Sequence, residues 1–94
     1  MQQDIIQKIE QDFENPGEII RLLSEMEEKV ETPISERIYR AIIFLSEGKI
    51  ENINHFINVY FKDYRDLLWQ AEYENTEIQK YNFNKSFKEL GLIK

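Results

Sequence analysis

Apolar side chains recur every three or four residues in five successive segments of the chain, and this spacing constrains the fold more than any other feature. Such a repeat places apolar side chains on one face of an α-helix. No segment alternates apolar and polar residues as a strand does, and no Asn-Gly or Asp-Gly pair marks a hairpin turn. The segments predicted to be helical span residues 2–13, 16–30, 34–47, 50–61 and 64–74.

The third segment has apolar residues on more than one face. Its in-phase stripe is widened by three further apolar side chains, Tyr39, Ile43 and Phe44. A helix that is apolar on most sides is usually buried on most sides, so we predict that this segment is the central helix. The expected fold is all-α, a compact bundle of five to six short helices with no sheet.

Residue types at the segment boundaries predict where several helices begin and end. Asn15 followed by Pro16 suits a helix start, because Asn accepts from an exposed backbone N–H and Pro is tolerated at the first helical position. Thr32 or Ser35 can cap the third segment in the same way. Gly48 suits its end, because glycine adopts the left-handed conformation that closes many helices.

The last third of the chain has weaker boundaries. Asp63 can cap a separate fifth helix, but neither Gly nor Pro interrupts the chain there, so one long bent helix is the alternative. Residues 75–83 lack clear periodicity and are predicted to form a loop. Asn84 can cap a short last helix through Leu90, and Gly91 would end it.

The 94 residues are expected to form a single domain of unlike parts. Residues 1–31 carry nine acids and three bases, a balance of −6, whereas residues 32–94 carry nine of each. Only Phe13 among the aromatic residues precedes residue 39. We therefore distinguish an acidic helical pair (1–31), aromatic-rich central helices (34–74), and a loop with a short C-terminal helix (75–94).

Residue types that catalysis and metal binding usually require are scarce. The chain has no cysteine and one histidine, His55, with Glu51 one turn before it. A di-metal carboxylate bundle needs Glu-x-x-His motifs and further glutamates on facing helices, and these are missing. The three glycines stand singly at helix ends, so they form no phosphate-binding loop. We expect a non-enzymatic protein with no catalytic residue, no metal and no cofactor.

Charge and hydropathy narrow the expected partners and location. A net charge of −6 disfavours nucleic acid, because duplex binding rests on neutralisation of phosphates by Lys and Arg. The longest apolar run is residues 41–45, far short of the roughly twenty residues that a membrane-spanning helix needs. Residues 1–12 lack the apolar region of a signal peptide. We expect a soluble, cytoplasmic protein, and its Ile-, Asn-, Lys- and Glu-rich composition is typical of low-GC bacteria.

The fifth segment provides the candidate interaction surface. Arg and Tyr are favoured anchors at protein interfaces, and this segment holds both beside acidic residues. Trp69 lies off the stripe that is predicted to face the core, so it must face something else. The candidate surface consists of Tyr64, Arg65, Asp66, Trp69, Glu72 and Tyr73.

These residues also have purely structural interpretations. Tyr64 lies on the apolar stripe of the fifth segment, so its structural interpretation places it in the core. The C-terminal tail, with Phe83 and Phe87 lying across Trp69, is the covering that we expect for the indole ring. A second subunit or another protein is the alternative covering.

The leading functional hypothesis is an interaction protein that binds another protein through its acidic helices or through the aromatic face of the fifth segment. A basic partner is expected, because an acidic surface speeds encounter with one. The alternative is a self-associating, homodimeric structural module joined through Trp69 and Tyr73. A third hypothesis is a small-ligand carrier or enzyme with an aromatic-lined pocket near Tyr39, Tyr64 or Trp69.

Overall fold

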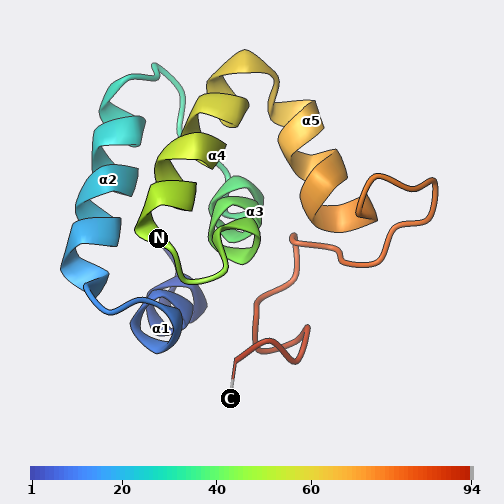
Figure 1. Cartoon of the computed structure of the whole chain (residues 1–94), viewed down its shortest axis with the longest axis horizontal. Helices are drawn as coiled ribbons and strands as arrows, with labels where there is room; N and C mark the ends of the chain where they lie inside the picture. The colour runs from blue at the N-terminus through green and yellow to red at the C-terminus, as the bar shows by residue number, and fades with distance from the viewer. Residues whose placement is uncertain (94) are drawn as a thin grey trace.

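The computed structural model describes residues 1–93, which form a bundle of short helices followed by a non-helical tail (Figure 1). Within these residues no strand forms, so the predicted all-α class is confirmed. The radius of gyration is 12.3 Å, close to the roughly 12 Å expected of a compact chain of this length. The helices are α1 (Gln3–Asp12), α2 (Pro16–Glu28), α3 (Glu36–Ser46), α4 (Ile50–Lys62), α5 (Tyr64–Leu68) and the π-helical turn η1 (Trp69–Tyr73).

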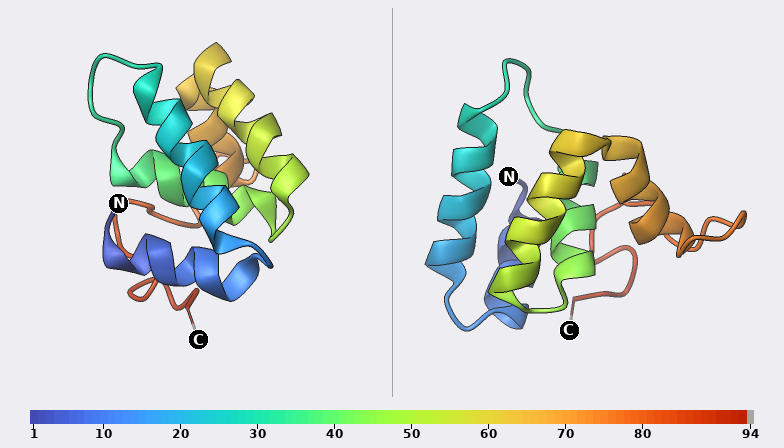
Figure 2. Two further views of the ribbon diagram at one scale, coloured as in Figure 1. Left: turned by 90° about the vertical axis from the view of Figure 1, so that its left-hand side faces the viewer. Right: turned by 45° about the horizontal axis from the view of Figure 1, so that its top comes forward.

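Helix α3 is the central helix, as its apolar periphery predicts. It packs against α1, α4, α5 and η1, and seven of its 11 residues are buried. Figure 2 shows α1 running crosswise below α2, with α3 enclosed between the other helices. The buried core draws on every region of the chain, from Ile5 in α1 to Phe87 in the tail. The bundle is therefore a single packed unit around α3.

Side-chain caps fix the starts of α2 and α3 where the sequence predicts. Asn15 accepts a hydrogen bond from the backbone N–H of Glu18 (3.4 Å), and Pro16 is the first residue of α2. Ser35, rather than Thr32, caps α3 by accepting from the N–H of Ile38 (3.4 Å). Of the two predicted caps for α3, the structure selects the one that directly precedes its first turn.

Two features of the end of α3 require a glycine at position 48. The chain leaves the helix through Glu47 and Gly48, which have φ values of 51° and 78° in the left-handed region. A Cβ atom at Gly48 would also lie 2.6 Å from the backbone oxygen of Asp12. Only glycine therefore combines this backbone angle with the close approach to the end of α1.

Helices α4 and α5 are separate, so the alternative of one long bent helix is wrong. Asp63 between them has an extended backbone (φ −162°, ψ 101°), and its carboxylate accepts from the N–H of Arg65 (3.0 Å). The chain turns a sharp corner here without Gly or Pro, because the Asp side chain replaces the missing helical hydrogen bond. We refer to residues 60–65 as the α4–α5 corner.

The predicted helix from Asn84 to Leu90 is wrong, because residues 84–90 form hydrogen-bonded turns instead. Ser86 and Glu89 cap each other's backbone N–H groups (3.1 and 3.2 Å) around a single turn. An Asn84 cap would take the N–H of Phe87, but that group donates to the carboxylate of Asp4 in α1 (2.9 Å). The tertiary contact with Asp4 thus replaces the local cap.

None of the helices formed by residues 1–93 combines the length and the apolar character needed to cross a lipid bilayer.

Candidate functional site

The structure separates the six residues of the predicted interaction surface. Tyr64, Arg65 and Asp66 are exposed on α5, and Trp69 is 46% exposed on η1. Tyr73 is half-buried. Tyr64 is 53% exposed, so its alternative assignment to the core is wrong. The sixth residue, Glu72, is completely buried and contributes nothing to the molecular surface.

Glu72 binds groups of its own chain. Its carboxylate accepts hydrogen bonds from Arg37 through Nε (2.8 Å) and Nη2, from the backbone N–H of Phe83 (2.9 Å) and from the amide of Gln79 (3.3 Å). Burial alone raises the pKa of Glu72, but the bonds from Arg37 and Phe83 outweigh it and hold the pKa below its ordinary range. Glu72 thus fastens η1 to α3 and to the tail.

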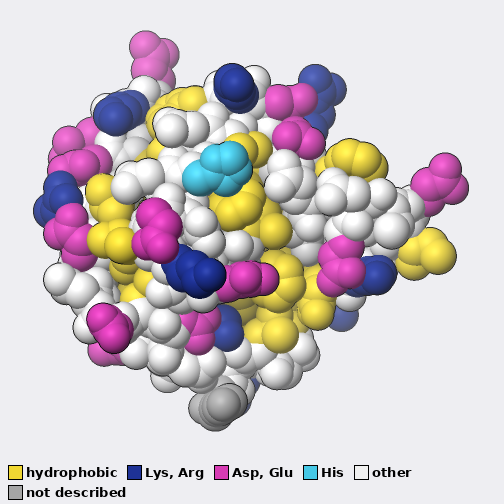
Figure 3. All heavy atoms as spheres, in the orientation of Figure 1, with side chains coloured by type: hydrophobic (Ala, Val, Ile, Leu, Met, Phe, Trp, Pro, Cys, Tyr) yellow, Lys and Arg dark blue, Asp and Glu magenta, His cyan; other side chains and the backbone are white. Residues whose placement is uncertain are grey.

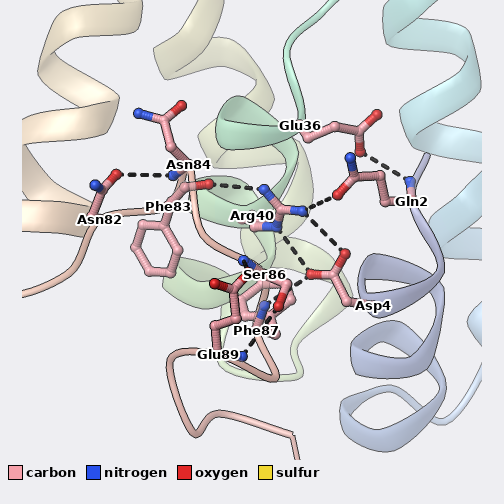
Figure 4. Close-up of polar contacts among 10 residues, drawn as sticks. All are labelled: Gln2, Asp4, Glu36, Arg40, Asn82, Phe83, Asn84, Ser86, Phe87 and Glu89. Carbon is pink, nitrogen blue, oxygen red and sulfur yellow. Dashed lines mark hydrogen bonds and ion pairs between the residues drawn. The ribbon is translucent and has the colours of Figure 1, made fainter.

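A second ion pair, drawn in Figure 4, fastens the tail to α1 and α3. Asp4 accepts from Arg40 Nε (2.9 Å) and Nη2 (3.1 Å) and from the backbone N–H of Phe87 (2.9 Å). Arg40 is only 2% exposed and also donates to the backbone oxygen of Phe83 (3.0 Å) and to the side chain of Gln2. Burial raises the pKa of Asp4, but the bonds from Arg40 and from the N–H of Phe87 outweigh burial and hold the pKa below its ordinary value.

We refer to the two pairs, Asp4–Arg40 and Arg37–Glu72, as the tail clamp. The side chains of Phe83 and Phe87 that it holds in place are fully buried. Phe83 packs beside Phe44 of α3, with ring centroids 5.2 Å apart. No buried side-chain nitrogen or oxygen of residues 1–93 lacks a hydrogen-bond partner, so the clamp is saturated within the chain.

The expectation that the tail covers Trp69 is therefore wrong. Phe83 and Phe87 pack into the core beside α1 and α3, because the clamp directs the tail there. The indole N–H of Trp69 donates to the backbone oxygen of Thr76 in the loop that follows η1 (3.1 Å). One edge of the ring is thus satisfied, while nearly half of the side chain stays open to solvent.

An open apolar groove of ≈ 290 Å³ lies where the α2–α3 loop meets the α4–α5 corner, both at the top of Figure 1. Exposed Tyr64 forms part of its wall. The lining residues share an apolar or aromatic character, apart from one serine and one arginine: Pro33, Ile34, Ser35, Arg37, Ile38, Tyr60, Tyr64 and Leu68. None of these lining residues is Asp, Glu or His, and Arg37 is occupied by Glu72.

An acidic pocket of ≈ 380 Å³ adjoins this groove. Its lining combines three glutamates with apolar and small residues: Glu27, Val30, Glu31, Thr32, Pro33, Ile34 and Glu36. Pro33 and Ile34 line both hollows, so the two are neighbours across the α2–α3 loop. We refer to the groove and the acidic pocket together as the loop–corner surface.

The glutamates of the acidic pocket have few partners. No ion pair links Glu27, Glu31 or Glu36 to any of residues 1–93. Glu27 accepts a hydrogen bond from the hydroxyl of Tyr39, and Glu36 accepts from the backbone N–H of Gln2 (3.0 Å). Burial and the nearby Glu27 carboxylate together raise the pKa of Tyr39, so this hydroxyl remains a donor. Each carboxylate has two oxygens, so the three side chains keep acceptor capacity beyond these two bonds.

His55, the only histidine, lies exposed near the middle of the face shown in Figure 3. Its ring meets Phe56 edge-on, with centroids 4.7 Å apart. In the part of the chain that the structure describes, no three His, Cys, Asp or Glu side chains converge as a metal site requires. The same view shows acidic side chains spread over α2 at its left edge.

Sequence reasoning missed both the tail clamp and the groove. Arg37 and Arg40 lie on a helix predicted to be buried on most sides, and buried charges need partners. That combination was a signal for the clamp, although it does not name Asp4 or Glu72. The groove depends on Pro33 and Ile34, and an apolar pair inside a connector was the available signal.

No family model, curated protein or solved structure shows a significant match to this chain.

Proposed function

We propose that this chain is a non-enzymatic interaction domain that binds another protein through the groove of the loop–corner surface. The observation that carries the proposal is Tyr64, which is 53% exposed at the wall of an apolar groove. Two further exposed aromatic residues flank Tyr64 in the sequence, Phe61 (43% exposed) and Trp69 (46% exposed). Exposed aromatic side chains beside an apolar hollow are typical of interface hot spots.

Energetics support this use of the groove. Burying the exposed half of an aromatic side chain contributes on the order of 1 kcal/mol, and neighbouring groove residues add to it. Single exposed apolar residues are normal on any surface, but Tyr64 lines a hollow that a partner side chain can fill. The nearby glutamates disfavour nucleic acid and anionic lipid as occupants, which leaves a protein segment as the favoured class.

Selection of random 12-residue peptides displayed on phage tests the proposal, with the wild-type protein as bait. We expect peptides whose affinity falls about tenfold with Tyr64→Ala, a change on the surface that leaves the core intact. Ile50→Ala is the matched control, because Ile50 is 40% exposed on the first turn of α4, away from the groove. A selection that yields no peptide, or only peptides insensitive to Tyr64→Ala, contradicts the proposal.

Self-association through η1 is the second candidate, and the exposed ring of Trp69 favours it. Tyr73, the other residue of that hypothesis, is half-buried and offers less contact area. Sedimentation velocity across a concentration series separates the candidates. We expect a monomer throughout, whereas a dimer that Trp69→Ala abolishes would favour self-association.

A further inference from the structure

The loop–corner surface brings together two features that lie in different parts of the sequence. The acidic pocket combines the end of α2 and the connector with the first residue of α3, and the groove combines the connector with the aromatic helices. Because Pro33 and Ile34 line both, a segment bound in the groove can reach the glutamates without leaving the surface. A partner that covers both hollows must therefore place an apolar side chain against the groove and, next to it, a side chain that complements the glutamates.

We infer that the partner of this domain presents a Lys or Arg side chain to the acidic pocket and neighbouring apolar side chains to the groove. This inference rests on the proposed function, since it names the chemistry of the segment that occupies the groove. The occupant is a basic, amphipathic protein segment, either helical or extended.

Charge complementarity carries the inference. Glu27, Glu31 and Glu36 have no cationic partner among residues 1–93, although other carboxylates of the acidic N-terminal third do. Glu18 and Glu25 on α2 both pair with Arg21. Arg37, the cation among the residues that line the groove, is held by Glu72. The pocket thus concentrates three negative charges that no ion pair of residues 1–93 neutralises.

Two of the carboxylates are already held in position. The Tyr39 hydroxyl, on a side chain that is 1% exposed, orients Glu27, and the backbone N–H of Gln2 orients Glu36. Each keeps further lone pairs for a donor from another molecule. Because these two glutamate side chains are already ordered, binding a Lys or Arg side chain costs less of their conformational entropy.

The apolar groove sets the second requirement. Its lining offers no free charge, so a wholly charged segment leaves it unfilled. A base and an apolar residue must therefore lie close together on one side of the partner segment, as at i and i+3 or i+4 of a helix. The same reasoning disfavours an acidic segment, which meets three unpaired carboxylates.

The test uses the peptides selected on the wild-type domain and measures their affinities by fluorescence anisotropy. The triple variant E27Q/E31Q/E36Q removes three charges but leaves one carbonyl oxygen on each side chain, which is enough to accept the bonds from Tyr39 and Gln2, so the fold is preserved. We expect it to weaken binding roughly fivefold or more, with the larger loss at low salt. The control E10Q/E14Q/E51Q removes three charges at exposed positions outside the acidic pocket and is expected to change affinity less than twofold.

Peptide variants complete the cycle. Replacing the Lys or Arg of a selected peptide by Gln should lower its affinity for the wild-type domain by the same factor as the triple substitution does. The same peptide change should not lower its affinity for the triple variant any further. If Tyr64→Ala weakens binding while the triple variant does not, the proposed function stands and this inference is overturned. Peptides that lack a base, or that carry acids, overturn it equally. If no peptide responds to Tyr64→Ala, the proposed function itself fails.

Discussion

Carboxylates occur in two opposite situations in this molecule, at the tail clamp and at the loop–corner surface. Glu72 and Asp4 are bound by guanidinium and backbone donors of the same chain. Glu27 and Glu31 are exposed and Glu36 is half-buried, and each has at most one hydrogen-bond donor and no cation among residues 1–93. A carboxylate that binds an arginine and further donors of its own chain fixes the fold, whereas one with a single donor or none keeps acceptor oxygens for another molecule.

The same contrast applies to aromatic residues. Phe87 is fully buried under the tail clamp, and Phe61 is 43% exposed at the α4–α5 corner. Both are phenylalanines in the aromatic-rich part of the chain, and sequence alone does not distinguish them. Their different burial indicates that the tail is part of the core and that the corner presents apolar surface to solvent.

Phe87→Ala should have the largest effect on stability. Removing a fully buried phenylalanine leaves a cavity, and we expect a loss of about 3–5 kcal/mol in the free energy of unfolding. Phe61→Ala, the matched change at the corner, should cost less than about 1 kcal/mol. Urea denaturation measures both, and equal losses would contradict the division between the two regions.

Glu72→Ala should cost about 3 kcal/mol, because it leaves the N–H of Phe83 buried without an acceptor and Arg37 without its partner. Hydrogen exchange should also accelerate in residues 80–93, which the clamp no longer holds. Glu31→Ala at the loop–corner surface should change stability by less than about 0.5 kcal/mol. A mild effect at Glu72 would mean that the clamp does not fasten the tail.

Acid should weaken the tail clamp. The pKa of Glu72 and of Asp4 is held below the ordinary values of 4.5 and 3.8. A group with a lowered folded pKa stabilises the fold above its ordinary pKa, and this contribution disappears as pH falls through the folded value. The free energy of unfolding should therefore fall as pH drops below 4.5, and further below 3.8.

Urea denaturation in steps from pH 7 to pH 3 measures this dependence. In Glu72→Ala the free energy of unfolding should depend less steeply on pH, since one of the two carboxylates of the tail clamp has been removed. A slope that is as steep in Glu72→Ala as in the wild type would show that the acid sensitivity has another origin.

The smallest effect on stability is expected from E27Q/E31Q/E36Q. Removing three like charges that lie together relieves repulsion, so the free energy of unfolding should stay constant or rise by a few tenths of a kcal/mol, roughly. Thermal denaturation checks this. A clear loss of stability would place these glutamates with the structural carboxylates of the tail clamp.

Local features of the fold could be predicted because their causes lie within a few residues. Asn15 caps α2 by accepting from an N–H three residues away, and Gly48 ends α3 through its own backbone angle. The central position of α3 follows from apolar residues on most of its sides. These predictions need only helix geometry and the chemistry of single side chains.

Long-range partners could not be predicted in the same way. Glu72 and Arg37 are 35 residues apart, and Asp4 and the N–H of Phe87 are 83 residues apart. Their pairing depends on how the helices pack, which no local spacing encodes. This is why Glu72 was assigned to a surface, and why Asn84 was predicted to cap a helix that Asp4 prevents.

The central claim is that the loop–corner surface meets the partner, while the tail clamp only holds the fold. Titration of the ¹⁵N-labelled domain with a selected peptide, followed by amide chemical shifts, tests this most directly. We expect shifts concentrated in residues 27–38 and 60–68, with residues 80–93 unchanged. Shifts centred on residues 80–93, or spread evenly over the chain, would contradict the claim.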